Sequence, residues 1–198
     1  MPPTPPGDDG DPIALFRALY ERARETGADA DAMVLATVDP DGCPSARFVL
    51  LKAFDERGLV FYTNLHSRKG RALARRPDAA LCFYWAPLEK QVRIEGRVEL
   101  VSDADADAYF AGRPRESQIG AWASSQSERL QSRALLDLRV EEARARFAGR
   151  PVPRPPSWSG FRVVPRAIEF WTRGEGRLNE RERYERAGAL WVKTLLYP

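Results

Sequence analysis

Residues 33–65, MVLATVDPDGCPSARFVLLKAFDERGLVFYTNL, contain three apolar runs separated by two short polar segments. Each run has the length of a β-strand and is rich in β-branched or aromatic residues. Both polar segments, Asp39–Gly42 and Asp55–Gly58, begin with aspartate and end with glycine, two residues that favour tight turns. Because tight turns join antiparallel neighbours, we expect an antiparallel meander rather than strand–helix–strand units. The expected strands are 33–38, 46–54 and 59–65.

On the N-terminal side, a segment rich in proline, glycine and aspartate precedes the first helix. The composition of residues 1–10 predicts a disordered tail. Asp11 is a good N-cap and Pro12 suits the first helical position, which predicts an amphipathic helix that ends at Gly27. We therefore expect a single domain over residues 11–198, preceded by a short tail.

On the C-terminal side, helical segments alternate with further strands. Ser67 is placed to cap a short basic helix that ends at Pro77. Residues 102–147 are largely helical, with a polar and irregular stretch over 113–127. Further strands are expected at 80–85, 91–101, 161–164, 167–172, 183–185 and 190–195. Antiparallel strands with helices between them predict an α+β fold, an antiparallel split or closed β-barrel with flanking helices.

The composition limits the classes of function. Of the 198 residues 43% are hydrophobic, and 31 basic against 28 acidic residues give a net charge of +3. That excess is too small to indicate a nucleic-acid-binding protein. Two cysteines, Cys43 and Cys82, and one histidine, His66, form no metal-binding pattern. Because neither a secretory signal nor a membrane-spanning run is present, we expect a cytoplasmic protein without membrane contact.

The end of the strand at 59–65 leads into a candidate phosphate site. Tyr62 and Thr63 supply hydroxyl groups, and Ser67, Arg68 and Lys69 follow at the start of the helix. Free backbone N–H groups, the helix dipole and two cations together suit a phosphate. The alternative is a simple N-cap with solvated cations. Since cations are unfavourable in a first helical turn, the sequence favours the anion site.

Two other sets of basic and hydroxyl residues are less specific. Arg47 and Lys52 are five residues apart and would lie on opposite faces of a regular strand. Tyr109, Arg113 and Ser117 are spaced by four, so they could line one side of a helix or loop and hold a second phosphate. For Arg47 and Lys52, the alternative is a pair of solvated charges on an exposed strand. For Tyr109, Arg113 and Ser117, the alternative is a surface turn.

Two further groups are informative only together with these sets. Gln126 and Ser127 could donate hydrogen bonds to phosphate oxygens. Trp171, Arg177 and Arg181 could pack against a flat conjugated ring and polarise it. Taken in isolation, the second group is better explained by a core-facing tryptophan beside a charged hairpin.

Together, these segments resemble the pyridoxine/pyridoxamine 5′-phosphate oxidase family, whose members use FMN to make pyridoxal 5′-phosphate. The matching segments follow the family's order over nearly all of residues 11–198. They are ATVDPDGCPSARFVLLK, FYTNLHSRKG, EKQVRIEGRVE, YFAGRPRESQIGAWAS, QSERL, PPSWSGFRV, IEFW and GEGRLNER. The resemblance implies a split-barrel homodimer with two FMN sites at the subunit interface.

The resemblance also implies which residues form the site. The FMN set is Arg47 to Lys52, Tyr62, Thr63, Arg68, Lys69, Gln91, Gln126, Ser127, Trp171 and Arg181. The positions for the substrate phosphate are Lys52, Tyr109, Arg113 and Ser117. Arg177 and Asn179 take the catalytic positions at the substrate ring. The implied chemistry is hydride transfer from a small phosphorylated substrate to FMN, followed by reoxidation with O₂, which releases H₂O₂.

Three departures from the family pattern leave the cofactor set untouched. Asn179 stands where the family has histidine, and asparagine cannot titrate near neutral pH. The family's longer N-terminal arm, which reaches over the substrate, has no counterpart in residues 1–10, and His66 stands where small residues are common.

One alternative function is a sibling flavin oxidase of the phenazine type that acts on another reduced ring or amine. A flavin- or pyridoxal-phosphate-binding carrier without enzyme activity is another.

Overall fold

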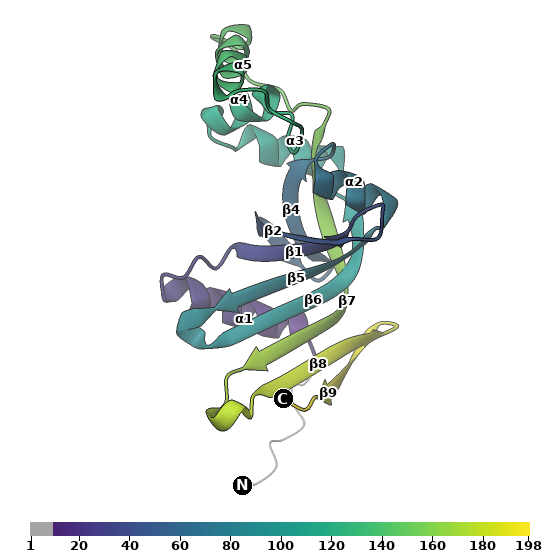
Figure 1. Ribbon diagram of the computed structural model, residues 1–198. Coiled ribbons are helices and arrows are strands. Elements are labelled where there is room, and N and C mark those ends of the chain that lie inside the picture. The colour runs from purple at the N-terminus through teal and green to yellow at the C-terminus, as the bar shows by residue number, and fades with distance from the viewer. Residues whose placement is uncertain (1–9) are drawn as a thin grey trace.

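The structure, a computed structural model, describes residues 10–198. Within these residues the chain forms one curled nine-stranded sheet and five α-helices (Figure 1). The strands are β1 (Ala32–Val38), β2 (Pro44–Leu50), β3 (Ala53–Asp55), β4 (Gly58–Asn64), β5 (Asp78–Trp85), β6 (Lys90–Leu100), β7 (Trp158–Thr172), β8 (Glu180–Ala187) and β9 (Leu190–Leu195). The helices are α1 (Pro12–Glu25), α2 (Arg68–Arg75), α3 (Asp103–Ala111), α4 (Arg115–Ala123) and α5 (Arg133–Arg146). Apart from Gly10, the expected disordered tail lies outside the described residues.

The pairing of the strands is antiparallel throughout, as expected, but their order is not that of a simple meander. The main path runs β2-β1-β5-β6-β7-β4-β3, while β8 pairs with β7 and β9 with β8. The pairings of β1 with β5 and of β4 with β7 join hairpins that lie apart in the sequence. These long-range pairings curl the sheet into the expected α+β split-barrel form, with α3, α4 and α5 gathered at one end (Figure 1).

The prediction of one strand over 46–54 is wrong, because the chain leaves the sheet at Leu51 and Lys52. The Leu51 N–H donates to the Asp31 carbonyl, and the Lys52 N–H donates to the Val60 carbonyl. Two strands result, β2 before the break and β3 after it. Consequently Arg47 and Lys52 do not share a strand, and their placement on opposite faces of one strand is also wrong.

The two strands expected at 161–164 and 167–172 are a single strand, β7, which runs for 15 residues. A β-bulge makes this possible: Gly96 pairs with Pro165 and Glu95 with Ala167, so Arg166 is the extra residue. Before the bulge Phe161 and Val163 face the core, and after it Ile168 and Phe170 do. The bulge therefore exchanges the faces of the odd- and even-numbered residues along β7.

The helix starts follow the expected capping chemistry. The Asp11 carboxylate accepts a hydrogen bond from the Ile13 N–H at the start of α1, and the Ser67 hydroxyl accepts one from the Gly70 N–H at the start of α2. Gly27, with φ of +73°, follows the end of α1 in the left-handed conformation that glycine favours. The prediction of an irregular stretch over 113–127 is wrong, because residues 115–123 form the helix α4, which packs against α5.

Two hydrophobic clusters hold these layers together. The larger one lies between α1 and the curled sheet, where the Phe16 ring contacts Phe54, Phe83 and Trp85. The smaller one lies beneath α3, α4 and α5 and includes Phe110, Ile119, Ala143, Phe147, Val152 and Trp158. Trp158 is the first residue of β7, so this strand begins in the smaller cluster and continues through the larger one.

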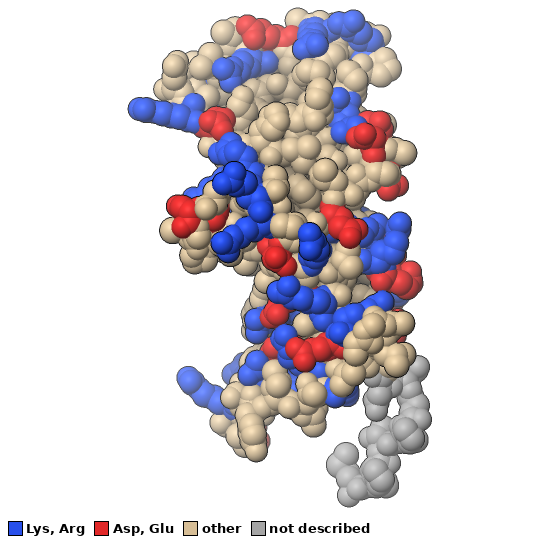
Figure 2. Space-filling view, turned by 90° about the vertical axis from the view of Figure 1, so that its right-hand side faces the viewer, with Lys and Arg blue, Asp and Glu red and all other residues tan. Residues whose placement is uncertain are grey.

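Charged side chains of both signs lie beside one another over the surface. Figure 2 shows basic and acidic residues interleaved across the face it presents. Many of them form ion pairs, such as Arg154 with Asp103 and Asp107. Among residues 10–198, no helix is long and apolar enough to cross a membrane.

Candidate active site

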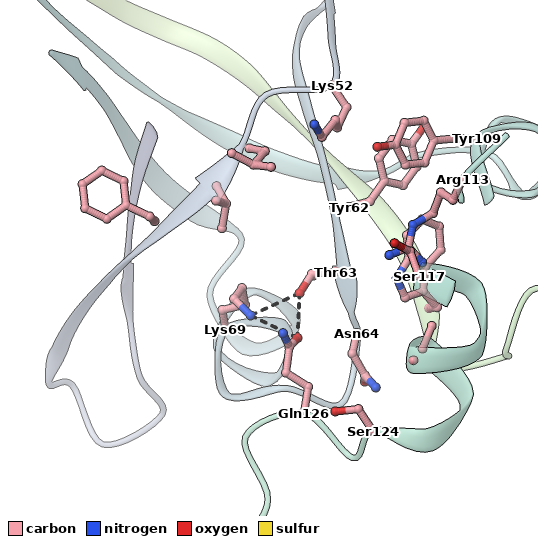
Figure 3. A pocket seen from close by; sticks show the side chains of 16 residues that line it. Lys52, Tyr62, Thr63, Asn64, Lys69, Tyr109, Arg113, Ser117, Ser124 and Gln126 are labelled. Atoms are coloured by element: carbon pink, nitrogen blue, oxygen red, sulfur yellow. Dashed lines mark hydrogen bonds between the residues drawn. The ribbon is translucent and has the colours of Figure 1, made fainter. Parts of the chain in front are cut away.

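A cavity of about 500 Å³ opens between β2, β4, the start of α2 and the helices α3 and α4 (Figure 3). We call it the Lys69–Arg113 cavity, after two cations in its wall. Eight of the residues singled out in the sequence line it, although they come from separate parts of the chain. They are Lys52, Tyr62, Thr63, Lys69, Tyr109, Arg113, Ser117 and Gln126.

Lys69 lies at one end of this cavity, in the first turn of α2. Its Nζ donates to Thr63 Oγ1 and to Gln126 Oε1, each at 3.2 Å, and to Ser67 Oγ at 3.4 Å (Figure 3 draws the first two). All three acceptors are neutral, and no ion pair within residues 10–198 involves Lys69. Burial, and then the nearby Arg47, lower the pKa of Lys69. The cavity thus holds a buried cation whose charge an anionic ligand would balance.

Arg113 lies at the other end, in the short connection between α3 and α4. Burial lowers its pKa, and its NH1 is buried without a hydrogen-bond partner among the described residues. The guanidinium lies 4.9 Å from the centre of the Trp158 ring and 5.5 Å from that of Phe110. Ser117 points toward it from α4 (Figure 3). A buried guanidinium nitrogen without an acceptor is suited to a ligand anion.

Three aromatic rings form a layered wall beside Arg113 (Figure 3). Tyr62 and Tyr109 are stacked with ring centres 4.0 Å apart and 2° between their planes, and Trp158 stacks 5.2 Å from Tyr62. The Tyr62 ring packs directly on Gly160, where an added Cβ would come within 2.7 Å of it. Burial raises the pKa of both tyrosines, which therefore stay neutral donors at physiological pH.

Lys52 reaches the cavity from the break between β2 and β3. Its Nζ lies 3.7 Å from Asp31, whose other carboxylate oxygen accepts a hydrogen bond of 2.6 Å from the Tyr20 hydroxyl. The long distance to Asp31 leaves the lysine available to a ligand as well.

Arg47, Arg68 and Ser127 lie near the cavity but do not line it. Arg47 donates to the Leu35 carbonyl and to the hydroxyl groups of Thr37 and Ser45. Arg68 is paired with the buried carboxylate of Asp39, and Ser127 lies in a turn with φ of +71°. These residues surround the start of α2 without pointing into the cavity.

The remaining predicted residues gather at the far end of the sheet, around the connection between β7 and β8 (Figure 1). Trp171, Arg177 and Asn179 line a second cavity there, of about 850 Å³, which we call the hairpin cavity. Gln91 and Arg181 lie on either side of Trp171 in the register of β6, β7 and β8. The structure therefore divides the predicted site into two groups within one chain.

Two side chains of this second group, those of Asn179 and Arg181, are held by contacts within the chain. Asn179 Oδ1 accepts a hydrogen bond of 3.2 Å from the Gly174 N–H, which closes the turn. Arg177 has φ of +66°, in the left-handed region that residues with a Cβ rarely adopt. The Arg181 guanidinium pairs with Glu169 at 2.9 Å and donates to the Tyr197 carbonyl at 3.1 Å. Glu169 is 3% exposed, so this ion pair is buried on its acidic side.

Sequence reasoning missed several residues of the Lys69–Arg113 cavity. Because 113–127 was expected to be irregular, Gly120 and Ser124 were not considered, although they lie three and seven residues after Ser117 on one face of α4. A helical reading of that stretch would have found them. Asn64 and Trp158 also line the cavity, and they face each other across β4 and β7. Their long-range pairing leaves no local signal in the sequence.

Two family models match the chain. Residues 19–147 match the model described as pyridoxamine 5′-phosphate oxidase, and residues 158–198 match that of the pyridoxine 5′-phosphate oxidase C-terminal dimerisation region. The second match covers β7, β8 and β9 together with the connection between β7 and β8, which supplies most of the lining of the hairpin cavity.

Curated relatives agree with these models. A protein of Myxococcus xanthus named pyridoxine/pyridoxamine 5′-phosphate oxidase is 60% identical over 189 residues, which cover 95% of this chain and 92% of the relative. A protein of the same name from Anaeromyxobacter dehalogenans is 53% identical over 197 residues, which cover 99% of this chain and all of the relative.

Solved structures share the fold. PhzG from Burkholderia lata, in complex with tetrahydrophenazine-1-carboxylic acid, superposes with a TM-score of 0.91 at 32% identity, covering 100% of this chain and 99% of PhzG. A pyridoxamine 5′-phosphate oxidase-related, FMN-binding protein from Nostoc punctiforme superposes with a TM-score of 0.75 at 20% identity, covering 95% and 98% of the two chains. Family models match most of the length of this chain, and curated relatives are more than 50% identical to it in sequence. The chain therefore belongs to the pyridoxine/pyridoxamine 5′-phosphate oxidase family.

Proposed function

We propose that the protein is an FMN-dependent oxidase that converts pyridoxamine or pyridoxine 5′-phosphate to pyridoxal 5′-phosphate, with O₂ as the acceptor. The observation that carries the proposal is a pair of cations, the buried Lys69 and the half-buried Arg113, at the two ends of one cavity with a stacked aromatic wall beside Arg113. Such a cavity suits two phosphates with conjugated rings between them, which is what FMN and a phosphorylated pyridine present together.

The Lys69 end of the cavity would hold the phosphate of FMN. Lys69 and Thr63 would donate to this phosphate directly. Gln126 would turn its amide N–H₂ toward the phosphate after the hydrogen bond from Lys69 to Gln126 breaks. The N–H groups at the start of α2 add the positive end of the helix dipole. Arg47 and Arg68 add positive charge behind this turn. FMN, when bound, supplies the two-electron chemistry that no side chain of this protein can provide.

The Arg113 end would hold the phosphate of the substrate. Arg113 and Lys52 supply charge, while Tyr109 and Ser117 supply hydroxyl groups that fix the orientation of the phosphate. Fixing this phosphate positions the C4′ carbon of the substrate, and positioning is the main contribution that such a site makes to the rate.

A second copy of the chain would complete the site with its hairpin cavity. Gln91, Trp171 and Arg181 would meet the flavin, while Arg177 and Asn179 would meet the pyridine ring. Exposed apolar side chains flank both regions: Phe48 and Leu178 are each 74% exposed. Their exposure in a single chain supports the proposal of a homodimer, in which a second copy would cover them.

The chain also determines how the proton balance is met. Pyridoxamine 5′-phosphate, O₂ and water give pyridoxal 5′-phosphate, ammonia and H₂O₂. Asn179 can donate a hydrogen bond to the substrate oxygen, but it cannot take up a proton. The proton that the substrate loses would therefore pass to a group other than residue 179, while Arg177 would orient the ring through its planar guanidinium.

The test is peroxide release by the FMN-loaded protein. We expect yellow protein that forms one H₂O₂ per pyridoxal 5′-phosphate, with kcat/KM about 100-fold higher for pyridoxamine 5′-phosphate than for pyridoxamine. The unphosphorylated amine is the matched control, since it differs only in the group that Arg113 would bind. FMN-loaded protein that binds the substrate but releases no peroxide above background would instead be a carrier.

A second candidate is a sibling flavin oxidase for a reduced phenazine-type ring, which the 32% identity to PhzG favours. Arg113→Ala separates the two, because a phosphorylated substrate should lose about 100-fold in kcat/KM and a substrate without phosphate should lose little. Arg115→Ala is the matched control: this neighbouring side chain donates to the carbonyls of Phe147 and Arg150, away from the cavity. It should keep kcat/KM within about threefold.

A further inference from the structure

Trp158 carries no charge and no catalytic group, yet it lies at the centre of the contacts at the Arg113 end of the cavity. It is the first residue of β7, is 7% exposed and lines the cavity. Its ring stacks on Tyr62 and meets the Phe110 ring edge-to-face, with ring centres 5.0 Å apart. The indole is therefore fixed on two sides by other rings.

The position of Arg113 depends on this ring. Within residues 10–198, Arg113 forms no ion pair, and its buried NH1 has no acceptor. Its guanidinium lies over the faces of Trp158, 4.9 Å from the ring centre, and of Phe110, 5.5 Å from the ring centre. A flexible side chain without a carboxylate partner is held only as well as the surfaces against it allow, and indole is the strongest cation–π partner.

We propose that Trp158 is a positioning residue that holds the Arg113 guanidinium ready for the substrate phosphate, and so sets the preference for phosphorylated substrates. The inference rests on the proposed function, because it takes Arg113 as the phosphate-binding group. Trp158 also stacks in one layer with Tyr62 and Tyr109, so it orders two donors of the site at once. A preformed cation spares the substrate the entropy of ordering it.

The chain contains a matched control for this arrangement. Trp122 in α4 holds Arg146 over its ring at 4.5 Å, in the same smaller cluster, but it does not line the Lys69–Arg113 cavity. Replacing either tryptophan removes one indole and one cation–π contact from that cluster. Only the replacement of Trp158 should affect the binding of the substrate.

The experiment compares Trp158→Met with Trp158→Phe in the FMN-loaded enzyme. With pyridoxamine 5′-phosphate, Trp158→Met should raise KM about tenfold and change kcat less than about threefold. The reason is that the Arg113 guanidinium keeps its charge but is no longer held in place. Trp158→Phe keeps a ring under the guanidinium and should bring KM back to within about threefold of the wild type. Trp122→Met should leave both constants unchanged. Trp158→Leu replaces the methionine variant if that variant does not fold.

A binding measurement provides a readout that does not depend on turnover. The dissociation constant of pyridoxal 5′-phosphate, measured by equilibrium dialysis, should rise by the same factor of about ten in Trp158→Met. Equal constants for the methionine and phenylalanine variants would overturn the proposal, because a ring would then have no special role.

Combining the variants with Arg113→Ala separates positioning from a general structural role. In that background Trp158→Met should cause no further rise in KM, since the side chain it holds is gone. An equal rise in both backgrounds overturns the role of Trp158 and leaves the proposed function intact. If Arg113→Ala alone leaves KM for the phosphorylated substrate unchanged, the phosphate assignment itself fails, and the role of Trp158 fails with it.

Discussion

The Lys69–Arg113 cavity and the hairpin cavity differ in how their cations are balanced. In the first, the buried Lys69 and the half-buried Arg113 have no carboxylate partner among the described residues. In the second, Arg181 is paired with Glu169, and Arg173 with Glu89. The first region is suited to receive anions, whereas two arginines at the second, Arg173 and Arg181, are already paired with carboxylates within the chain. This contrast supports the proposal that the first region provides ligand-binding charge and that the second would be supplied to the site of another copy.

The largest expected effect comes from placing substitutions in one region or the other of a mixed dimer. Arg113→Ala and Arg177→Ala should each reduce kcat/KM about 100-fold as homodimers. A purified mixed dimer with one variant on each chain should regain about half of the wild-type activity, because one of its two shared sites is intact. Two affinity tags allow the mixed dimer to be isolated and assayed for H₂O₂.

The control places both substitutions on one chain, paired with a wild-type chain. Each shared site then contains one altered region, so this mixed dimer should be almost inactive. If every site were built within a single chain, the results would be reversed: the first mixed dimer would be inactive and the second would retain half of the activity.

A smaller effect is expected at Asn179, where the family pattern has histidine. Asn179→His should introduce an ionisation near pH 6.5, the ordinary pKa of histidine, into the pH dependence of kcat, with a change in kcat of about threefold to tenfold. Asn179→Ala removes the hydrogen bond to the Gly174 N–H without adding a titrating group, so it should not show this ionisation. A wild-type profile that already shows it would assign the proton transfer to another residue.

The smallest expected effect is on stability, at Lys69. Its pKa is lowered on folding, so the protonated lysine costs stability at neutral pH, and that cost disappears as the pH rises through the folded pKa toward 10.5, the unfolded value. Lys69→Met should therefore raise Tm of the FMN-free protein by about 2–4 °C at pH 7 and by less at pH 10, while weakening FMN binding. Scanning calorimetry at both pH values measures the difference.

A matched variant for this measurement is Arg71→Met on the same helix. Arg71 is exposed and paired with Glu128, so its loss should not raise Tm. A lower Tm for Lys69→Met than for the wild type at pH 7 would contradict the view that Lys69 is retained for binding at the expense of stability.

The local elements could be predicted from the sequence because their signals are local. Asp11 and Ser67 cap their helices as expected, and the turns at 39–42 and 55–58 connect the expected strands. The order of the strands could not be predicted, since the pairing of β4 with β7 brings together residues about a hundred positions apart. Contacts of that kind depend on how the whole sheet closes.

The candidate site was predictable to a different extent in its two parts. Charged and hydroxyl side chains such as Lys69 and Arg113 were found because their chemistry is distinctive, and the structure places them in one cavity. Trp158 was missed because a buried tryptophan in a strand is usually only part of a core. The division of the predicted residues into two regions was also hidden, since no spacing in the sequence reports which end of a sheet a residue reaches.

The single extra residue in β7, Arg166, has a consequence for how the gene can change in length. The strand connects the two cavities, from Trp158 at one to Trp171 at the other. Deleting Arg166 would exchange the two faces of the sheet for every later residue of β7. Glu169 would then point into the hydrophobic core, and Phe170 would point toward the arginines that now pair with Glu169. Indels between 158 and 172 should therefore be depleted in a library selected for growth, whereas the exposed turn at 188–189, between β8 and β9, should accept them.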